Sequence, residues 1–169
     1  TRDPDLFAAA VDLGRELLRW HTFGARFNPD NLPLSGRAAA VTTAPTPYPN
    51  THTYDPTTFR LRIGDIVTIT DLTPAVHAYE VSGLKILQSW LGYRMQRPRG
   101  RASSPLDALR PAHWTPAITQ ELLELVWVLE HTLALHPRQA DLHARILAAP
   151  RFTADELPRP TLAERKPPP

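Results

Sequence analysis

Prolines decide where regular structure can begin in this chain, because 19 of its 169 residues are proline. Proline lacks a backbone N–H and fixes φ, so it suits the first position of a helix and disturbs a helix interior. Three pairs of a capping residue and a proline mark the expected starts of helical segments, namely Asp3-Pro4, Thr73-Pro74 and Thr115-Pro116. The first and third pairs predict helices that begin there, and the second predicts a short helical or irregular segment.

Apolar residues at helical spacing extend the predicted helices. One helix is expected over residues 4–21 and another over residues 82–94. The strongest pattern starts after Thr115 and meets Pro137, which should break one helix and open the next. The sequence therefore predicts an antiparallel pair of helices over residues 116–149.

Strand signals are confined to one short region. Residues 24–54 contain five prolines and no periodic pattern, which predicts a long Pro-rich loop. Residues 58–70 alternate apolar residues with Arg60 and Arg62 and contain the turn Gly64-Asp65, so a β-hairpin is expected there.

The predicted fold is α+β, mainly helical, with one small antiparallel β-hairpin or sheet and a C-terminal antiparallel helix pair. One domain is expected over residues 1–157, since a chain of this size can bury a substantial core. The last twelve residues, 158–169, include five prolines and should form an extended tail.

Positive charge is concentrated in one segment. Residues 1–81 carry seven basic and nine acidic residues, and residues 115–169 carry six and seven, so the two segments have net charges of −2 and −1. Residues 82–114 carry six basic residues against one acidic residue, a net charge of +5. Four arginines fall between residues 94 and 101 beside Pro98 and Gly100, which oppose a helix. A flexible basic loop is therefore predicted over residues 94–104.

Two interpretations of this basic loop are open. Its arginines could be solvated or paired with the Glu-rich face of the following helix, or they could contact the phosphates of DNA or RNA. The concentration of charge, the arginine content and the neighbouring Lys85, Ser103 and Ser104 favour phosphate contact. Of the aromatic residues close by, Trp90 is expected in the core, while Tyr93 could stack on bases or pack.

No familiar catalytic motif is present. The sequence contains no phosphate-binding loop, no dinucleotide-binding glycine pattern and no metalloprotease or serine hydrolase motif. It has no cysteine, and His131, His136 and His143 do not pair at the i, i+4 spacing of a metal site. We therefore predict no catalytic residue, no metal and no cofactor in this chain. A cytoplasmic location is expected, since no run of apolar residues reaches membrane-spanning length and no leader is apparent.

Several stretches together resemble a known family. They are Tyr79 to Arg94 (YEVSGLKILQSWLGYR), Ser103 to Asp107 (SSPLD), Trp114 to Pro116 (WTP) and Glu121 to Leu125 (ELLEL). In this order they resemble the C-terminal specificity domain of type ISP restriction–modification enzymes and related large bacterial adenine-specific DNA methyltransferases. His77 departs from this resemblance, because the family is expected to place a large aromatic residue there.

The resemblance implies that the chain is one part of a larger enzyme. Such enzymes carry a nuclease, a helicase-like ATPase motor, an N6-adenine methyltransferase and a target recognition domain in one polypeptide. The parent enzyme would use S-adenosylmethionine, ATP and Mg²⁺, while this part would recognise DNA without catalysing a reaction. Its expected partners are duplex DNA and the methyltransferase and motor domains.

The sequence thus predicts a target recognition domain that contacts duplex DNA through its basic loop. The expected DNA-binding residues are Lys85, Arg94, Arg97, Arg99, Arg101, Ser103 and Ser104, with bases read from this loop or from residues 41–54. The alternative is a helical module that docks onto the methyltransferase or motor domains without reading DNA. It is suggested by the helix after Thr115, where Leu123, Val126, Trp127 and Val128 make more than one face apolar.

Overall fold

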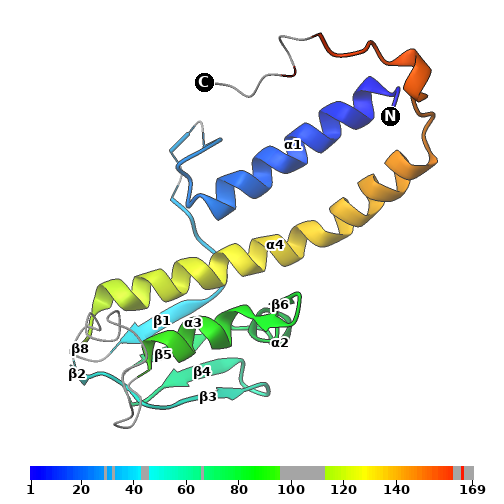
Figure 1. Cartoon of the computed structure of the whole chain (residues 1–169). Helices are drawn as coiled ribbons and strands as arrows, with labels where there is room; N and C mark the ends of the chain where they lie inside the picture. Colours follow the sequence, from blue (N-terminus) through cyan, green and yellow to red (C-terminus); the bar gives the residue numbers. More distant parts are fainter. Residues whose placement is uncertain are drawn as a thin grey trace.

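The computed structural model describes residues 1–28, 30–31, 33–42, 46–65, 67–95, 113–161 and 165. These residues form an α+β fold with four α-helices, a four-stranded antiparallel sheet and a separate two-stranded hairpin (Figure 1). The sheet lies on one side of a long central helix, and the first helix of the chain lies on the other side.

Helices α1 (Pro4–His21) and α4 (Pro116–Ala148) run antiparallel along one another (Figure 1). Asp3 caps α1 by accepting hydrogen bonds from the backbone N–H groups of Asp5 and Leu6. Thr115 caps α4 through the N–H of Ile118. Both Asp/Thr-Pro pairs therefore start helices as predicted, because the cap satisfies an N–H that a helix leaves free.

The predicted antiparallel helix pair over residues 116–149 is wrong. Residues 116–148 form one continuous helix with Pro137 in its interior. Proline at this position removes a single backbone hydrogen bond, and packing against α1 compensates for it. Leu135 and Leu142, on either side of Pro137, are both buried against α1. Tertiary packing has thus overridden a local helix-breaking signal.

The sheet is larger than the predicted hairpin. Its strand order is β1-β5-β4-β3, with every neighbouring pair antiparallel. The hairpin within residues 58–70 is present as its centre, although Ile63 pairs with Val67, so three residues separate the strands instead of two. The strands are β1 (Ala39–Thr42), β3 (His52–Asp55), β4 (Arg60–Ile63) and β5 (Val67–Thr70).

The long Pro-rich loop predicted over residues 24–54 is also wrong, because it contains β1, β3 and the short strand β2 (Thr46–Pro47). Strand β2 pairs with β8 (His113–Trp114), far along the sequence. Strand β1 forms an edge of the sheet beside β5. These strands have no alternating pattern of their own, since their partners and not their composition stabilise them.

The helix predicted over residues 82–94 begins later than expected. Ser82 and Gly83 have φ of 51° and 82° and form the turn between β6 (Glu80–Val81) and β7 (Leu84–Lys85). Two consecutive positive φ angles suit a tight hairpin turn and exclude a right-handed helix. Helix α3 therefore covers Ile86–Arg94. Just before the hairpin, Thr73 caps the short helix α2 (Pro74–His77).

The core has two parts that α4 joins. The larger part lies between the sheet, α3 and the first half of α4, where Leu61, Ile69 and Leu122 are fully buried. The smaller part consists of Leu6, Leu13, Trp20, Leu135 and Leu142, between α1 and the second half of α4. Leu123, Val126 and Val128 of α4 are all buried within this chain, so its several apolar faces are explained without a further domain.

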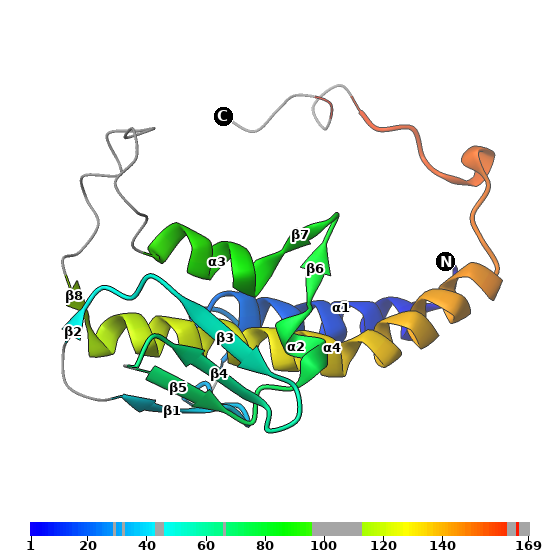
Figure 2. The ribbon, with the colours of Figure 1, turned by 90° about the horizontal axis from the view of Figure 1, so that it is seen from below.

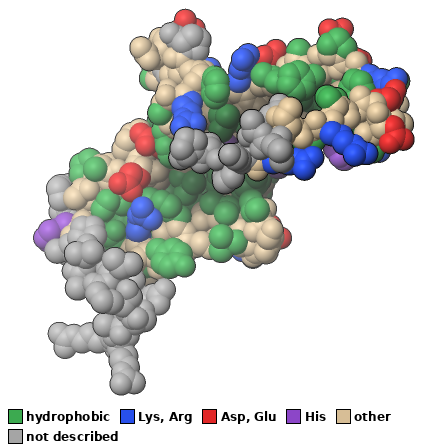
Figure 3. All heavy atoms as spheres, turned by 45° about the horizontal axis from the view of Figure 1, so that its top comes forward, with side chains coloured by type: hydrophobic (Ala, Val, Ile, Leu, Met, Phe, Trp, Pro, Cys, Tyr) green, Lys and Arg blue, Asp and Glu red, His purple; other side chains and the backbone are tan. Residues whose placement is uncertain are grey.

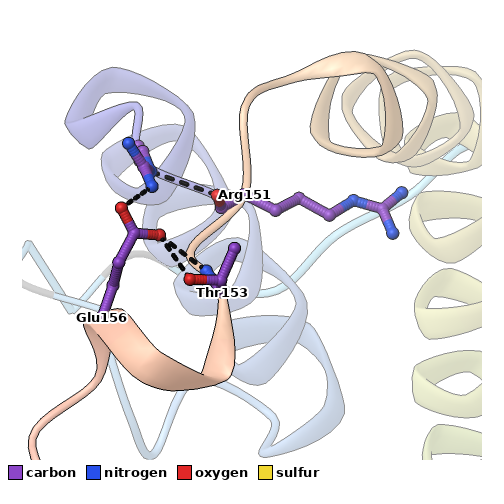
Figure 4. A network of polar contacts seen from close by, with 4 residues as sticks. Arg151, Thr153 and Glu156 are labelled. Carbon is purple, nitrogen blue, oxygen red and sulfur yellow. Dashed lines mark hydrogen bonds and ion pairs between the residues drawn. The ribbon is translucent and has the colours of Figure 1, made fainter.

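A polar network ties the segment after α4 to the start of α1 (Figure 4). The Arg2 guanidinium donates to the backbone oxygen of Arg151 at 3.1 Å and forms an ion pair with Glu156. Glu156 belongs to a short 3-10 helix (Ala154–Glu156) and also accepts from the N–H and hydroxyl of Thr153 at 2.8 and 2.9 Å. These contacts lower the pKa of Glu156, with the backbone hydrogen bond from Thr153 contributing most.

Candidate nucleic-acid interface

The end of α3 carries the last described residues before the basic loop. Arg94 stacks over the ring of Trp90, with its guanidinium carbon 3.8 Å from the ring centroid. The same guanidinium donates to a carboxylate oxygen of Glu121 on α4 at 3.2 Å. Arg94 is therefore already engaged by a ring and a carboxylate, as in the interpretation that pairs arginines with the Glu-rich face of the next helix.

Trp114 belongs to a cluster of aromatic side chains where the described chain resumes after residues 96–112. Trp114 is 1% exposed, and its indole N–H donates to the Thr119 hydroxyl at 2.8 Å. Its ring lies edge-on to Trp90 at 6.3 Å and beside Tyr48 at 5.6 Å. These contacts confirm that Trp90 and Trp114 serve packing, and they connect α3, β8 and the segment after β2.

The chain is buried in the same core on both sides of residues 96–112. Met95, just before them, is 7% exposed, and His113–Trp114, just after them, pairs with β2. Of the sequence-predicted site residues, Arg97, Arg99, Arg101, Ser103 and Ser104 lie outside the described residues.

Lys85 and Arg94 lie at opposite ends of α3. Lys85 is exposed in β7 and faces Glu80 across the hairpin, while Arg94 is the last residue of the helix. Nine helical residues span about 14 Å, so the two side chains do not form one cluster. Tyr93, one residue before Arg94, is 71% exposed and therefore does not pack in the core, while its stacking on bases stays a prediction.

The sequence reasoning overlooked two arginines on the outer face of the sheet. Arg60 and Arg62 alternate with the buried Leu61 and Ile63 along β4, so both point away from the core. Within the described residues, neither guanidinium has a hydrogen bond or ion pair. The alternation was visible in the sequence, but which side of the strand faces solvent depends on the position of α4.

His77, the residue that departs from the family resemblance, still makes an aromatic contact. Its ring stacks on Tyr54 with centroids 3.9 Å apart and planes 13° apart. The Gln88 amide donates to its backbone oxygen at 2.6 Å. Burial lowers the pKa of His77, and the nearby His52 and Lys85 add to this effect. The pKa of His52 is lowered by burial as well.

Two of the three histidines on α4 have structural partners. His131 stacks on Trp20 at 3.4 Å, and its Nε2 lies 2.9 Å from the backbone oxygen of Ser35. His136 lies beside the ring of Tyr79 at 5.9 Å. In the part of the chain that the structure describes, no three His, Asp or Glu side chains are grouped so as to hold a metal ion. No helix there is long and apolar enough to cross a membrane.

One comparison with known proteins identifies a family. The sequence profile described as "Type ISP C-terminal specificity domain" matches residues 1–125. The match covers α1, the whole sheet, α3 and the first part of α4. No curated protein matches the chain. No solved structure matches it either.

Proposed function

The chain belongs to the type ISP C-terminal specificity domain family, and from this premise we propose that it recognises duplex DNA through its basic loop. Membership of this family implies that the domain recognises the DNA target of a restriction–modification enzyme. The observation that carries the proposal is the net charge of +5 in residues 82–114 of a chain whose total is only +2. Such a concentration of arginine matches the regular negative charge of DNA.

In this proposal the residues of the basic loop have different roles. Arg97, Arg99 and Arg101 contact phosphates or read guanine, and a bidentate contact to guanine contributes about 1 to 3 kcal/mol of discrimination. Ser103 and Ser104 donate hydrogen bonds to phosphate oxygens. Arg94 has a supporting role, because Trp90 and Glu121 already hold its guanidinium.

The burial of the chain on both sides of residues 96–112 supports this proposal. Met95 and Trp114, which flank these residues, both lie in the larger core. A loop held at both ends loses less conformational entropy when it binds than a free tail would. Lys85, at the far end of α3, would contact DNA outside the loop.

No reaction step is proposed for this chain. The methyl donor, ATP and Mg²⁺ implied for the parent enzyme are assigned to its other domains, since the sequence has neither a phosphate-binding loop nor a methyltransferase motif. The described residues offer no grouped acidic or histidine ligands for a metal ion. We propose that residues 1–157 act as one recognition domain beside the methyltransferase and motor domains.

The proposal is tested by the salt dependence of DNA binding. The full chain is titrated against a labelled, mixed-sequence duplex at a series of salt concentrations. Replacing Arg97, Arg99 and Arg101 with alanine should reduce the slope of log K against log salt by up to about 2.7, or about 0.9 for each lost phosphate contact. An unchanged affinity and slope would contradict the proposal. The matched lysine variant should keep most of the slope, because lysine retains the charge.

A second candidate function is docking onto another domain of the parent enzyme, and one observation favours it. Phe7 and Leu18 lie eleven residues apart on one side of α1 and are 67% and 44% exposed. With 3.6 residues per turn they lie about 130° around the helix from Leu13, away from the side that packs on α4. A lack of duplex binding by the full chain, together with retained binding to the methyltransferase and motor domains that is lost in Phe7→Ser, would favour this function.

A further inference from the structure

The outer face of the four-stranded sheet is open in the described structure. Along β4 and β5 the burial alternates, with Leu61, Ile63, Val67 and Ile69 inside and the intervening residues outside. Figure 2 views the molecule from the side away from α1, with the sheet in front of α4. The inward residues of the sheet pack on α3 and α4, and no described helix covers the outward ones.

The outward residues of neighbouring strands form a row that is polar except for the exposed Val41. Strand register places Val41 opposite Thr68, Thr68 opposite Arg62, and Arg62 opposite Thr53. Arg60 lies two residues from Arg62 on the same face, about 7 Å away along the strand. The face therefore combines two guanidinium groups with short hydroxyl side chains, all of which can donate hydrogen bonds.

The acidic residue opposite Arg60 does not neutralise it through an ion pair. Asp55 pairs with Arg60 in register, but its carboxylate accepts from the N–H groups of Thr57 and Thr58 and from the Thr58 hydroxyl, at 2.9, 3.4 and 2.6 Å. These hydrogen bonds hold the carboxylate in the turn after β3. Arg60 and Arg62 are left without an internal partner among the described residues.

The sheet lies close to β8, the first described element after the basic loop. Only residues 43–45 separate β1 from β2, and only residues 48–51 separate β2 from β3. Strand β2 pairs with β8, where the chain returns from the basic segment. Strand β8 is therefore close to the end of the sheet where β1 and β4 finish and β3 begins (Figure 2).

We infer that the open sheet face, through Arg60 and Arg62, is a second contact surface for duplex DNA that binds its phosphate backbone. The inference rests on the proposed function and adds the outer face of the sheet to the basic loop as a DNA contact. Its chemistry selects the ligand class, because guanidinium and hydroxyl donors match phosphate oxygens. The row contains no aromatic side chain, so it lacks the stacking surface on which single-stranded nucleic acid binds.

The width of the face further restricts the mode of contact. Four strands at about 4.8 Å spacing are wider than the major groove, which is about 12 Å across and admits a helix or a two-stranded ribbon. The sheet therefore lies against the backbone and orients the basic loop, which reads the bases. By contrast, the side of the molecule that carries α1 mixes basic and acidic side chains without a single-sign patch (Figure 3).

The test compares three double variants of the full chain on a labelled, mixed-sequence duplex. Arg60→Ala with Arg62→Ala should lower the salt slope by about 1.8 and weaken binding roughly 60-fold at about 0.1 M salt, because two phosphate contacts are lost. Arg26→Ala with Arg159→Ala removes the same charge from two exposed positions off the sheet and should leave the slope unchanged. Arg60→Lys with Arg62→Lys should retain most of the slope.

An unchanged slope in the Arg60 and Arg62 alanine variant would overturn the inference, as would an equal loss in the Arg26 and Arg159 control. Equal or better competition by a single strand would also overturn it. The alanine variant of Arg97, Arg99 and Arg101 is measured in parallel, so a loss there without a loss at the sheet rejects the sheet alone. Absence of duplex binding at about 100 μM, the weak end of non-specific affinity, would overturn both proposals. Unchanged thermal unfolding midpoints confirm that the variants are folded.

Discussion

The two halves of α4 belong to different surroundings, although they form one helix. The first half packs between the sheet, α3 and the segment that crosses from α1 to β1. The second half packs mainly on α1, in a core of five buried residues, and His136 near its start also lies beside the ring of Tyr79. The sheet, together with Met95 and Trp114 on either side of residues 96–112, packs with the first half. In the proposed function this half therefore supports recognition, while the other half forms an arm with a separate, smaller core.

The largest expected effect contrasts one leucine from each half. Leu122 is fully buried in the larger core, so Leu122→Ala should lower the free energy of unfolding by about 4 to 5 kcal/mol. Leu142 is 9% exposed in the smaller core, where neighbours can relax, so Leu142→Ala should cost about 2 to 3 kcal/mol. Chemical denaturation measures both. Equal costs would remove the distinction between the two halves.

The junction between the halves is tested by Pro137. If α4 is continuous, Pro137→Ala restores a helical hydrogen bond and should raise the free energy of unfolding by up to about 3 kcal/mol. If residues around Pro137 instead form a turn between two helices, the same change should be neutral or destabilising. Urea denaturation, with helix content followed by circular dichroism, separates these outcomes.

The segment that crosses α4 between the halves should tolerate little additional volume. The indole N–H of Trp127 donates to the Ala38 oxygen, and Glu130 accepts from the Arg37 N–H, both at 2.8 Å. A Cβ added at Gly36 would overlap the Trp127 and Glu130 side chains. We expect Gly36→Ala to cost about 1 to 3 kcal/mol in thermal or chemical unfolding.

Gly14→Ala is the matched control for this change. A Cβ at Gly14 meets nothing within 4 Å, and the residue lies inside α1. This control should therefore stabilise the protein by about 0.5 to 1 kcal/mol. If both alanine variants had the same effect, the close packing assigned to the crossing segment would be wrong.

The smallest expected effect is a loss of stability between about pH 7 and pH 5 that arises in the sheet half. Burial lowers the pKa of His52 and His77 in the folded chain below the usual value of about 6.5. The unfolded chain then binds more protons, so stability is fully present above about pH 6.5 and declines as the pH falls through the lowered folded values.

His77→Phe provides the measurement for this dependence. Phenylalanine keeps a ring against Tyr54 but cannot titrate, so the loss of stability between about pH 7 and pH 5 should be smaller than in the wild type. The Gln88 hydrogen bond to the backbone oxygen of residue 77 can persist in this variant. A pH profile identical to the wild type would show that His77 does not contribute.

Local signals in the sequence predicted the starts of helices but not the sheet. Asp3-Pro4 and Thr115-Pro116 act within one turn, so the sequence alone located α1 and the start of α4. Strands β1 and β2 depend on partners far along the chain, and their short sequences carry no period of two. At Pro137 the local signal was clear but misleading, because α1 supplies packing that no local rule includes.

One part of the candidate interface can be located from the sequence, and the other part depends on tertiary packing. Charge counting locates the basic segment, because net charge is a property of the sequence itself. That Arg94 pairs with Glu121, and that Arg60 and Arg62 face outward on an uncovered sheet, depend on how α3, α4 and the sheet pack together. The sequence alone therefore predicts Arg94 as a DNA contact without showing its ion pair with Glu121, and it does not show that Arg60 and Arg62 face outward.

Arginine footprinting tests directly whether the basic loop and the outer face of the sheet contact DNA. The full chain is treated with an arginine-selective dicarbonyl reagent, with and without duplex DNA, and modification of each arginine is measured by mass spectrometry. If both surfaces bind the phosphate backbone, DNA should protect Arg60, Arg62, Arg97, Arg99 and Arg101 and leave Arg26 and Arg159 as reactive as before. Protection of Arg26 or Arg159, or of none of these arginines while the duplex is bound, would contradict it.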